Sequence, residues 1–397
     1  MFESIEAVFI KFCDYCNLDC SYCFEAYSQK EKHGIFIKAK ELRKFLNTCN
    51  LAPEVTFKFT GGEVSLCLPE LEKTIKELKK VERDHDIKTH VAITTNGTKM
   101  DQIIDLMDRG IVDAYPSKVS WDGIYSASKS RKPKINPEIY TDKYFNDNIK
   151  LLGQSKHGKD LLVRMAVSED TIDSLADSFQ YAIDCGCTKL EYYYLFTDEV
   201  KCCYSEPAFI AKLAEQLRKI AEIYQRQPFD YENWNNLIYT EYIAEDKCNL
   251  RNIYCQHVGR MLFIDLQGRL YPCGVFSSDG WYKDNPMDIG NIYTGIDMKK
   301  LETFANGFGK FRPCTHNECT NYHCVRCPTI MYYTKNRYGD KTMYELCRLL
   351  TLEKEIFLST ADKSIDLDKI KNKMSYAKRP PMNYNIPDIC KIRGGQL

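Results

Sequence analysis

Three cysteines near the amino end of the chain, Cys16, Cys20 and Cys23, have the types and spacing that metal chemistry needs. Their C-x3-C-x2-C pattern places three thiolates on one short loop. Such a loop can ligate three corners of a cubane iron–sulfur cluster and leave the fourth iron open. Cys13 lies nearby, but it ends an apolar strand and is predicted to point away. A zinc loop is the alternative, although zinc sites favour paired C-x2-C units.

The stretch from Cys16 to Phe24, CNLDCSYCF, resembles the signature of the radical S-adenosylmethionine (SAM) enzymes, including the aromatic Tyr22 before the last cysteine. In that family the open iron chelates the amino and carboxylate groups of SAM, and an electron from the cluster cleaves SAM to a 5'-deoxyadenosyl radical. The protein positions and shields this cofactor. The resemblance places Tyr22 and Phe24 beside the cofactor.

Residues 60–63, TGGE, resemble the GGE motif of the same family. There the glycines let the backbone approach the ligand, and the carboxylate meets the SAM ammonium group. A Gly-Gly turn is common on its own, but this one follows the next strand after the cysteine loop. The resemblance implies SAM contacts from Gly61, Gly62 and Glu63.

The later strand ends carry further candidates. Residues 95–98, TNGT, are either a frequent family feature or an Asn-Gly turn with a capping threonine. Residues 120–123, SWDG, resemble the Ser-x-Asp-Gly motif of the peptide-modifying branch, which an arginine for the SAM carboxylate often follows. Here the intervening residues 124–130 depart from the usual pattern. A charge inside a strand is paired or functional, and the family packs adenine at the end of the sixth strand. The implied SAM contacts are Asn96, Ser120, Asp122, Arg131, Arg164 and Leu195.

Apolar strands that alternate with amphipathic helices must position these loops. The pattern predicts strands over 5–12, 55–60, 88–95, 115–120, 161–167 and 189–196, and helices over 38–49, 69–83, 99–109, 141–153 and 171–184. Six strand–helix units predict an α/β fold, a partial (β/α)6 radical SAM barrel with a parallel sheet. Chemistry in such folds gathers where the strands end, which is where the candidates fall.

Composition excludes several classes of function. The chain has 55 Lys and Arg residues and 55 Asp and Glu residues, so its formal net charge is zero. We therefore expect no electrostatic attraction to nucleic acid or to an anionic membrane. No signal peptide or membrane span is present in the sequence pattern. The 19 cysteines fit metal clusters in a reducing compartment better than disulfides. We therefore expect a cytoplasmic protein that binds neither nucleic acid nor membrane.

Cysteines accumulate in the second half, beyond a helix predicted from residue 205 whose apolar spacing marks it as core. The strand–helix alternation is expected to stop after Pro228. Residues 261–273 form a hairpin-like pattern with a turn at Gln267-Gly268 and end in Tyr-Pro-Cys. This part resembles the C-terminal SPASM extension, which carries two auxiliary 4Fe-4S clusters. By position, Cys248, Cys255, Cys273 and Cys327 would hold the first cluster, and Cys314, Cys319, Cys324 and Cys347 the second.

The second group departs from the usual C-x2-C-x5-C-x3-C spacing, so the assignment of these cysteines to the two clusters stays open. A zinc site with His316 or His323 as a ligand is the alternative. Gly274 stands where anaerobic sulfatase-maturating enzymes carry an aspartate base, which argues against sulfatase maturation; the nearest following carboxylate is Asp279. Cys202 and Cys203 are either thiol hydrogen donors or incidental.

The expected organisation is a radical SAM partial barrel over 1–200, a bridging helix over 201–230, a SPASM auxiliary-cluster domain over 231–350, and a C-terminal helix with a polar tail over 351–397. The expected cofactors are SAM and three 4Fe-4S clusters.

The leading hypothesis is a radical enzyme that forms a thioether or carbon–carbon crosslink in a ribosomally made peptide. It would need an external electron donor of flavodoxin or ferredoxin type. Because the sequence opens directly on its first strand, a leader peptide would bind a separate protein or the barrel rim. The alternatives are a radical dehydrogenase or epimerase of a small molecule, and a cysteine-rich zinc or iron–sulfur protein without turnover.

Overall fold

The computed structural model describes residues 4–23, 37–195, 206–227, 230–231, 260–277 and 286–309, with 349, 352–353, 355–357 and 359. Its strands are β1 Ile5–Cys13, β2 Leu18–Cys20, β3 Leu51–Gly61, β4 Lys88–Thr95, β5 Lys118–Ser120, β6 Arg131–Pro133, β7 Leu162–Val167, β8 Lys189–Tyr194, β9 Asp230–Tyr231, β10 Met261–Ile264, β11 Leu270–Tyr271, β12 Gly290–Asn291 and β13 Gly295–Ile296. The helices are α1 Ala39–Leu46, α2 Leu68–Leu78, α3 Val81–His85, α4 Met100–Asp108, α5 Ser126–Lys129, α6 Asp142–Gln154, α7 Leu175–Cys185, α8 Pro207–Arg226 and α11 Met298–Gly309.

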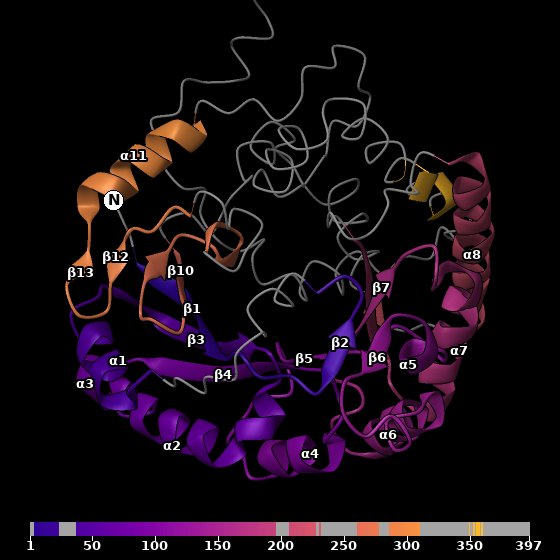
Figure 1. Cartoon of the computed structure of the whole chain (residues 1–397), viewed down its shortest axis with the longest axis horizontal. Coiled ribbons are helices and arrows are strands. Elements are labelled where there is room, and N and C mark those ends of the chain that lie inside the picture. The colour runs from indigo at the N-terminus through magenta and orange to yellow at the C-terminus, as the bar shows by residue number, and fades with distance from the viewer. Residues whose placement is uncertain are drawn as a thin grey trace, which may run out of the picture.

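Nine strands form one sheet in the order β11-β10-β1-β3-β4-β5-β7-β8-β9. The six predicted strands, β1, β3, β4, β5, β7 and β8, pair in parallel in chain order. The sheet curves, and helices α1 to α8 follow its outer side (Figure 1). The α/β fold with a partial parallel barrel is therefore confirmed.

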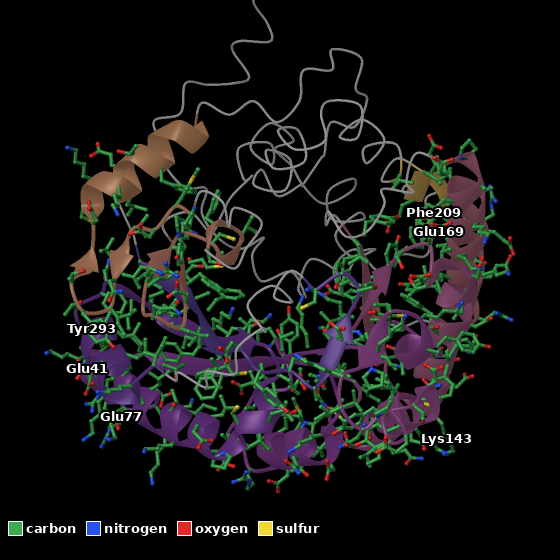
Figure 2. All side chains as sticks on the ribbon, in the orientation of Figure 1. Glu41, Glu77, Lys143, Glu169, Phe209 and Tyr293 are labelled. Atoms are coloured by element: carbon green, nitrogen blue, oxygen red, sulfur yellow. The ribbon has the colours of Figure 1, made fainter. Side chains whose placement is uncertain are left out.

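Alternate residues on each strand explain why the helices cover one face. Val55, Phe57 and Phe59 of β3 point into the apolar core under the helices, so Lys58 and Thr60 belong to the inner face of the curve. Charged side chains such as Glu41, Glu77 and Lys143 lie on the outer side of the helix layer (Figure 2). The inner face thus carries the polar residues of the strands.

Some predicted boundaries were wrong. The strand predicted from residue 115 begins at Lys118, since Pro116 has no N–H for a ladder hydrogen bond. The helix predicted over 69–83 is two helices, α2 and α3. The helix predicted from 171 begins at Leu175, after a 3-10 turn over Ile172–Ser174.

The second half of the chain extends the same sheet. β9 follows α8 and pairs in parallel with β8, which adds one two-residue strand to the alternation just beyond Pro228. The predicted hairpin is confirmed, because β10 and β11 pair antiparallel around Gly268, whose φ is +75°. β10 also pairs in parallel with β1. The hairpin therefore completes the edge of the barrel sheet.

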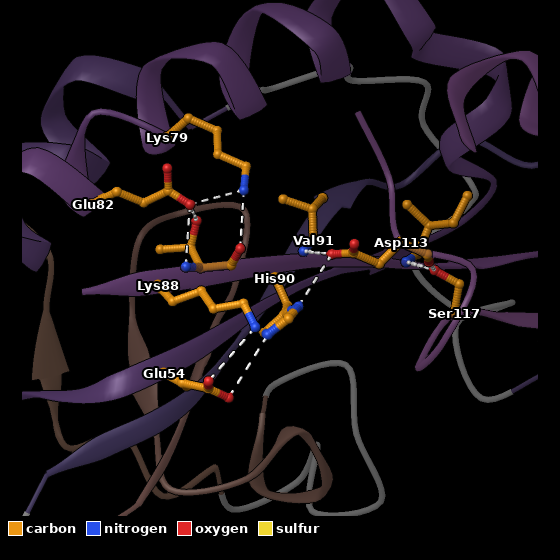
Figure 3. Close-up of polar contacts among 10 residues, drawn as sticks. Glu54, Lys79, Glu82, Lys88, His90, Val91, Asp113 and Ser117 are labelled. Carbon is orange, nitrogen blue, oxygen red and sulfur yellow. Dashed lines mark hydrogen bonds and ion pairs between the residues drawn. The ribbon is translucent and has the colours of Figure 1, made fainter. Parts of the chain in front are cut away.

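Polar contacts at the amino ends of the strands fix their register, at the opposite edge from the predicted site (Figure 3). The Glu54 carboxylate of β3 lies 3.6 Å from Lys88 Nζ and 3.9 Å from His90 Nε2, both on β4. Asp113 accepts the Val91 N–H at 2.8 Å. These contacts tie β3 and β4 to the loop before β5. Among the described residues no helix has the length and apolar character needed to cross a membrane.

Candidate cofactor site

The cysteine loop begins where β1 ends and runs along the carboxyl edge of the sheet. β1 ends at Cys13, and the loop returns as β2, which pairs antiparallel with β6 so that Cys20 lies opposite Arg131. Cys16 is buried, whereas Cys20 and Cys23 are half-buried. The loop is thus held between the end of β1 on one side and the segment after β5 on the other.

Cys13 is engaged away from the other three cysteines. Its thiol is fully buried and shares a hydrogen bond with Cys67, and this bond, together with burial, raises the pKa of Cys13. The thiol also lies 3.9 Å from the carbonyl oxygen of Tyr15. Its predicted place at the strand end is confirmed, and its partners leave Cys16, Cys20 and Cys23 as the candidate ligands.

The three candidate ligands lie close enough to affect one another's pKa values. Burial raises the pKa of Cys16 to about 12, and the nearby Glu63 carboxylate and Cys23 thiol add to the shift. Burial likewise raises the pKa of Cys20, while the Arg131 cation acts in the opposite direction. Metal binding releases these thiol protons, because the thiolate is the ligand.

The donor set of Cys16, Cys20 and Cys23 fits an iron–sulfur cluster. All three side chains are thiols without a disulfide, and each thiolate of a cubane cluster binds a different iron. N–H groups also point at two of the sulfurs, as described below, and such bonds suit anionic thiolates.

Glu63 fastens the ends of β3 and β4 together. One carboxylate oxygen accepts the hydroxyl of Thr95 at 2.6 Å and the N–H of Ser65 at 3.0 Å, and the other accepts the N–H of Asn96 at 2.5 Å. The side chain is buried, and burial raises its pKa although these bonds oppose the shift. The second oxygen keeps a lone pair for one further donor, so SAM contact by Glu63 stays a prediction.

Gly61 and Gly62 pack directly on the cysteine loop. A Cβ at Gly61 would lie 2.2 Å from the carbonyl oxygen of Cys13, and a Cβ at Gly62 would lie 2.2 Å from that of Tyr15. The N–H of Gly62 donates to the Cys13 carbonyl at 2.8 Å. The glycines therefore allow the end of β3 to pack on the cysteine loop, and their contact with SAM stays a prediction.

Asn96 connects β4 to the cysteine loop. Its Nδ2 donates to Asn17 Oδ1 at 2.8 Å and lies 3.7 Å from Cys16 Sγ. Its Oδ1 accepts both the N–H and the hydroxyl of Thr98, at 3.0 and 2.7 Å. The Asn-Gly turn of the alternative is present, since Gly97 has a φ of +76°. The capping threonine was wrong, because the N-cap of α4 is Lys99, whose side chain makes no cap.

Asp122 anchors the other half of the loop. Its Oδ2 accepts the Tyr22 hydroxyl at 2.5 Å and the Ser130 hydroxyl at 2.6 Å, and its Oδ1 accepts the Ala166 N–H at 3.0 Å. Arg131 Nε lies 3.1 Å from Oδ2 and forms an ion pair with it. The carboxylate is fully enclosed by these donors, and the predicted SAM contact of Asp122 stays a prediction.

Arg131 lies between this carboxylate and the sulfur of Cys20. The residue is 5% exposed, its Nη1 is 3.8 Å from Cys20 Sγ, and its guanidinium carbon is 5.7 Å from the centre of the Tyr22 ring. The structure therefore brings Arg131 to the cysteine loop, as the sequence predicted for a cofactor-binding residue, but against a sulfur. Its predicted contact with the SAM carboxylate is untested.

Ser120 and Arg164 face each other across β5 and β7. Ser120 is half-buried at the end of its strand, and within the described residues its hydroxyl makes no hydrogen bond, which suits a ligand contact. Arg164 forms an ion pair with Glu191, whose carboxylate also accepts Lys118 Nζ at 2.9 Å. These two cations lower the pKa of Glu191 despite its burial. SAM contact by Ser120 and Arg164 stays a prediction.

Leu195 completes an apolar group beside the loop. It packs with Tyr22 and Ala166, and the partly buried Cys20 and Tyr193 lie against them. The sequence predicted that Tyr22 and Leu195 border the cofactor, and the structure brings both to one place although 173 positions separate them. This group forms an apolar wall next to the Asp122 network.

Several predicted residues lie outside the described part of the chain: Phe24, Cys202, Cys203, Cys248, Cys255, Asp279, Cys314, His316, Cys319, His323, Cys324, Cys327 and Cys347. Cys273 is half-buried and packs against an apolar cluster that includes Phe263 and Tyr271. A Cβ at Gly274 would lie 2.8 Å from the Phe263 ring. Gly274 therefore leaves room for the Phe263 ring, in addition to lacking the carboxylate that would act as a base.

Sequence reasoning assigned no role to the residues that support the site, although Thr95 lies in the TNGT stretch that it selected. Thr95 and Ser130 hold the two carboxylates, and Lys118 and Glu191 complete the ion pairs of Arg164. The rule that selected Arg164, a charge inside a strand, applies equally to Lys118 and Glu191. No sequence signal marks Ser130.

Comparisons with known proteins agree with this geometry. Residues 10–119 match the Radical SAM superfamily. The structure of native anSMEcpe with bound AdoMet and Cp18Cys peptide is 16% identical with a TM-score of 0.61, over 89% of this chain and 99% of that one. Streptococcus suis SuiB bound to S-adenosylmethionine is 14% identical with a TM-score of 0.51, over 83% and 72%. SuiB bound to the precursor peptide SuiA is 14% identical with the same TM-score, over 83% and 70%. At these identities the likeness shows a shared fold. The curated protein sequences contained no match.

Proposed function

We propose that this protein is a radical SAM enzyme that modifies a ribosomally made peptide by forming a thioether or carbon–carbon crosslink. The match of residues 10–119 to the Radical SAM superfamily supports this proposal. The observation that carries the proposal is the convergence of three strand-end loops on one cysteine loop. After β3 the backbone N–H of Glu63 donates to the Tyr15 carbonyl, and after β4 Asn96 Nδ2 lies against Cys16 Sγ. After β5 Asp122 accepts the hydroxyl of Tyr22.

Cys16, Cys20 and Cys23 would hold the SAM-binding cluster in this proposal. With the cluster and SAM bound, the cofactor supplies a 5'-deoxyadenosyl radical that abstracts a hydrogen atom. The chain's own part is to fix the loop and keep water away. Tyr22, Ala166 and Leu195 provide an apolar wall, and the Glu63 lone pair and Ser120 hydroxyl provide polar contacts.

The peptide substrate is supported by the neighbours in fold. The anSMEcpe structure contains a Cp18Cys peptide, and the SuiB structure contains its precursor peptide SuiA. The second half of the chain would add a SPASM domain with two auxiliary clusters on Cys248, Cys255, Cys273, Cys314, Cys319, Cys324, Cys327 and Cys347. An external flavodoxin- or ferredoxin-type protein would supply electrons, and a separate protein or the barrel rim would bind a leader peptide.

Iron and sulfide analysis of anaerobically reconstituted protein tests the cofactor content. Three 4Fe-4S clusters predict about twelve iron and about twelve sulfide per chain. A variant with Cys16, Cys20 and Cys23 changed to alanine should lose about four of each. A wild-type value of about four would contradict the auxiliary clusters, and no loss in the triple variant would contradict the SAM-binding cluster.

A reaction with SAM, a reductant and a short peptide encoded beside the gene tests the substrate. The expected result is 5'-deoxyadenosine together with a peptide that has lost hydrogen atoms at the crosslinked residues. The triple alanine variant is the control. Turnover of SAM with a sugar or an amine, and none with the peptide, would favour the second candidate, a dehydrogenase or epimerase of a small molecule.

A further inference from the structure

Two nitrogen donors point at two different sulfurs of the cysteine loop. Asn96 Nδ2 lies 3.7 Å from Cys16 Sγ, and Arg131 Nη1 lies 3.8 Å from Cys20 Sγ. We propose that Asn96 and Arg131 set the reduction potential of the cluster by donating N–H···S hydrogen bonds to two of its three ligands. This inference rests on the proposed function, since it needs a cluster on this loop.

The donor at Cys16 is fixed in orientation. Asn96 Oδ1 accepts two bonds from Thr98, and Nδ2 donates to Asn17. Turning the amide over would place its oxygen against Cys16 Sγ and break all three bonds. The backbone N–H of Asn96 is held in turn by Glu63. The amide therefore presents an N–H, and never its oxygen, to the sulfur.

The donor at Cys20 is fixed by backbone pairing and by charge. Cys20 and Arg131 are register partners in the β2–β6 pair, so the two side chains start from adjacent strands. Asp122 lies 3.1 Å from Arg131 Nε and holds the guanidinium. With only 5% of the residue exposed, solvent screens its charge weakly.

Such donors favour the reduced cluster. Reduction places an additional negative charge on iron and sulfur, and N–H groups stabilise that charge more than they stabilise the oxidised state. Removing a donor should therefore lower the potential and make the first electron harder to deliver. The role is one of positioning and tuning, since neither residue needs to touch SAM to exert it.

A redox titration followed by electron paramagnetic resonance, with SAM omitted, tests the inference. The SAM-binding cluster is identified in a separate sample as the signal that changes when SAM is added. Arg131→Gln removes the donor and the charge, Arg131→Lys keeps the charge but loses the planar fork, and Asn96→Ala removes the other donor. Iron content and circular dichroism show whether each variant folds and holds its clusters.

We expect the potential to fall in the order wild type, Arg131→Lys, Arg131→Gln. In Arg131→Gln the ratio of reduced to oxidised cluster at a fixed potential should fall about tenfold, which corresponds to about 59 mV for one electron. Lys132→Gln makes the same change of charge at the neighbouring exposed residue and should leave the potential unchanged. Asn148→Ala, which loses only a bond to the Gly97 carbonyl, is the matched control for Asn96→Ala.

Two outcomes separate the possible failures. If Arg131→Lys and Asn96→Ala load iron normally and keep the wild-type potential, the inference is wrong, and weaker SAM binding in those variants would assign the two residues to SAM instead. If wild-type protein shows no iron–sulfur signal that SAM perturbs, the proposed function itself fails.

Discussion

The phenol of Tyr22 donates to the carboxylate of Asp122 across 2.5 Å, joining the cysteine loop to the end of a strand a hundred residues further along the chain. Both side chains are buried, and burial raises the pKa of Tyr22, so the phenol remains a neutral donor. Because Asp122 also accepts the N–H of Ala166, this one carboxylate ties the loop to β5 and β7 together.

Tyr22→Phe should destabilise the protein and loosen the loop. A hydrogen bond to a charged group contributes about 1.5–3 kcal/mol, so the free energy of unfolding should fall by about that amount. Denaturant unfolding under anaerobic conditions measures it. Tyr125→Phe is the matched control, because Tyr125 is 52% exposed. Equal stability of the two variants would show that the Tyr22–Asp122 bond contributes nothing.

Gly62→Ala should disturb the cysteine loop without touching any cysteine. The new methyl group would overlap the Tyr15 carbonyl oxygen at 2.2 Å, and overpacking of this kind costs about 1–3 kcal/mol. We expect fewer iron atoms per chain after reconstitution. Gly110→Ala is the control, because nothing lies within 4 Å of the new methyl group although the φ of +67° at Gly110 disfavours alanine. Iron loss in both variants would refute the packing argument.

The main strands and the loops after them could be predicted from the sequence, because their signals are local. The apolar runs of β3, β4 and β7 and the turn residues that end them lie within short windows of sequence. Since parallel strands end at one edge, the order of the strands along the chain is enough to assign Glu63, Asn96 and Asp122 to one site.

Other features depend on contacts that no local window contains. β2 and β6 have three residues each, too few for a periodic pattern, yet their pairing sets Cys20 against Arg131. The pairing of β10 with β1 joins segments about 250 residues apart. The packing of Gly61 and Gly62 against the loop at Cys13 and Tyr15 likewise joins segments that no local window contains.

Glu191→Gln should destabilise the inner face of the barrel. Glu191 is 8% exposed and compensates the charges of both Lys118 and Arg164. Removing one partner of a buried pair costs about 3–5 kcal/mol, and we expect the lower end because the Arg164 side chain is 33% exposed. Denaturant unfolding measures the loss. Asp147→Asn breaks an exposed pair with Lys143 and should cost less than about 0.5 kcal/mol; a similar cost for Glu191→Gln would contradict the pairing.

Asp84→Asn should remove a contribution to stability that depends on pH. Arg43 of α1 donates two hydrogen bonds to Asp84 of α3, at 2.7 and 2.9 Å. These bonds lower the pKa of Asp84 from 3.8 to about 2. Because the folded pKa is below the unfolded one, the carboxylate stabilises the fold fully above pH 3.8, and this contribution is lost as the pH falls towards 2.

The difference in unfolding free energy between wild type and Asp84→Asn should therefore be constant near neutral pH and shrink below about pH 4. Urea unfolding at a series of pH values measures it. Salt should also reduce the difference, because the pair is accessible to solvent. Asp170→Asn is the control for the loss of one carboxylate at an exposed loop residue. A difference that grows as the pH falls would have the wrong sign for an ion pair and would contradict the stabilising pairing of Arg43 with Asp84.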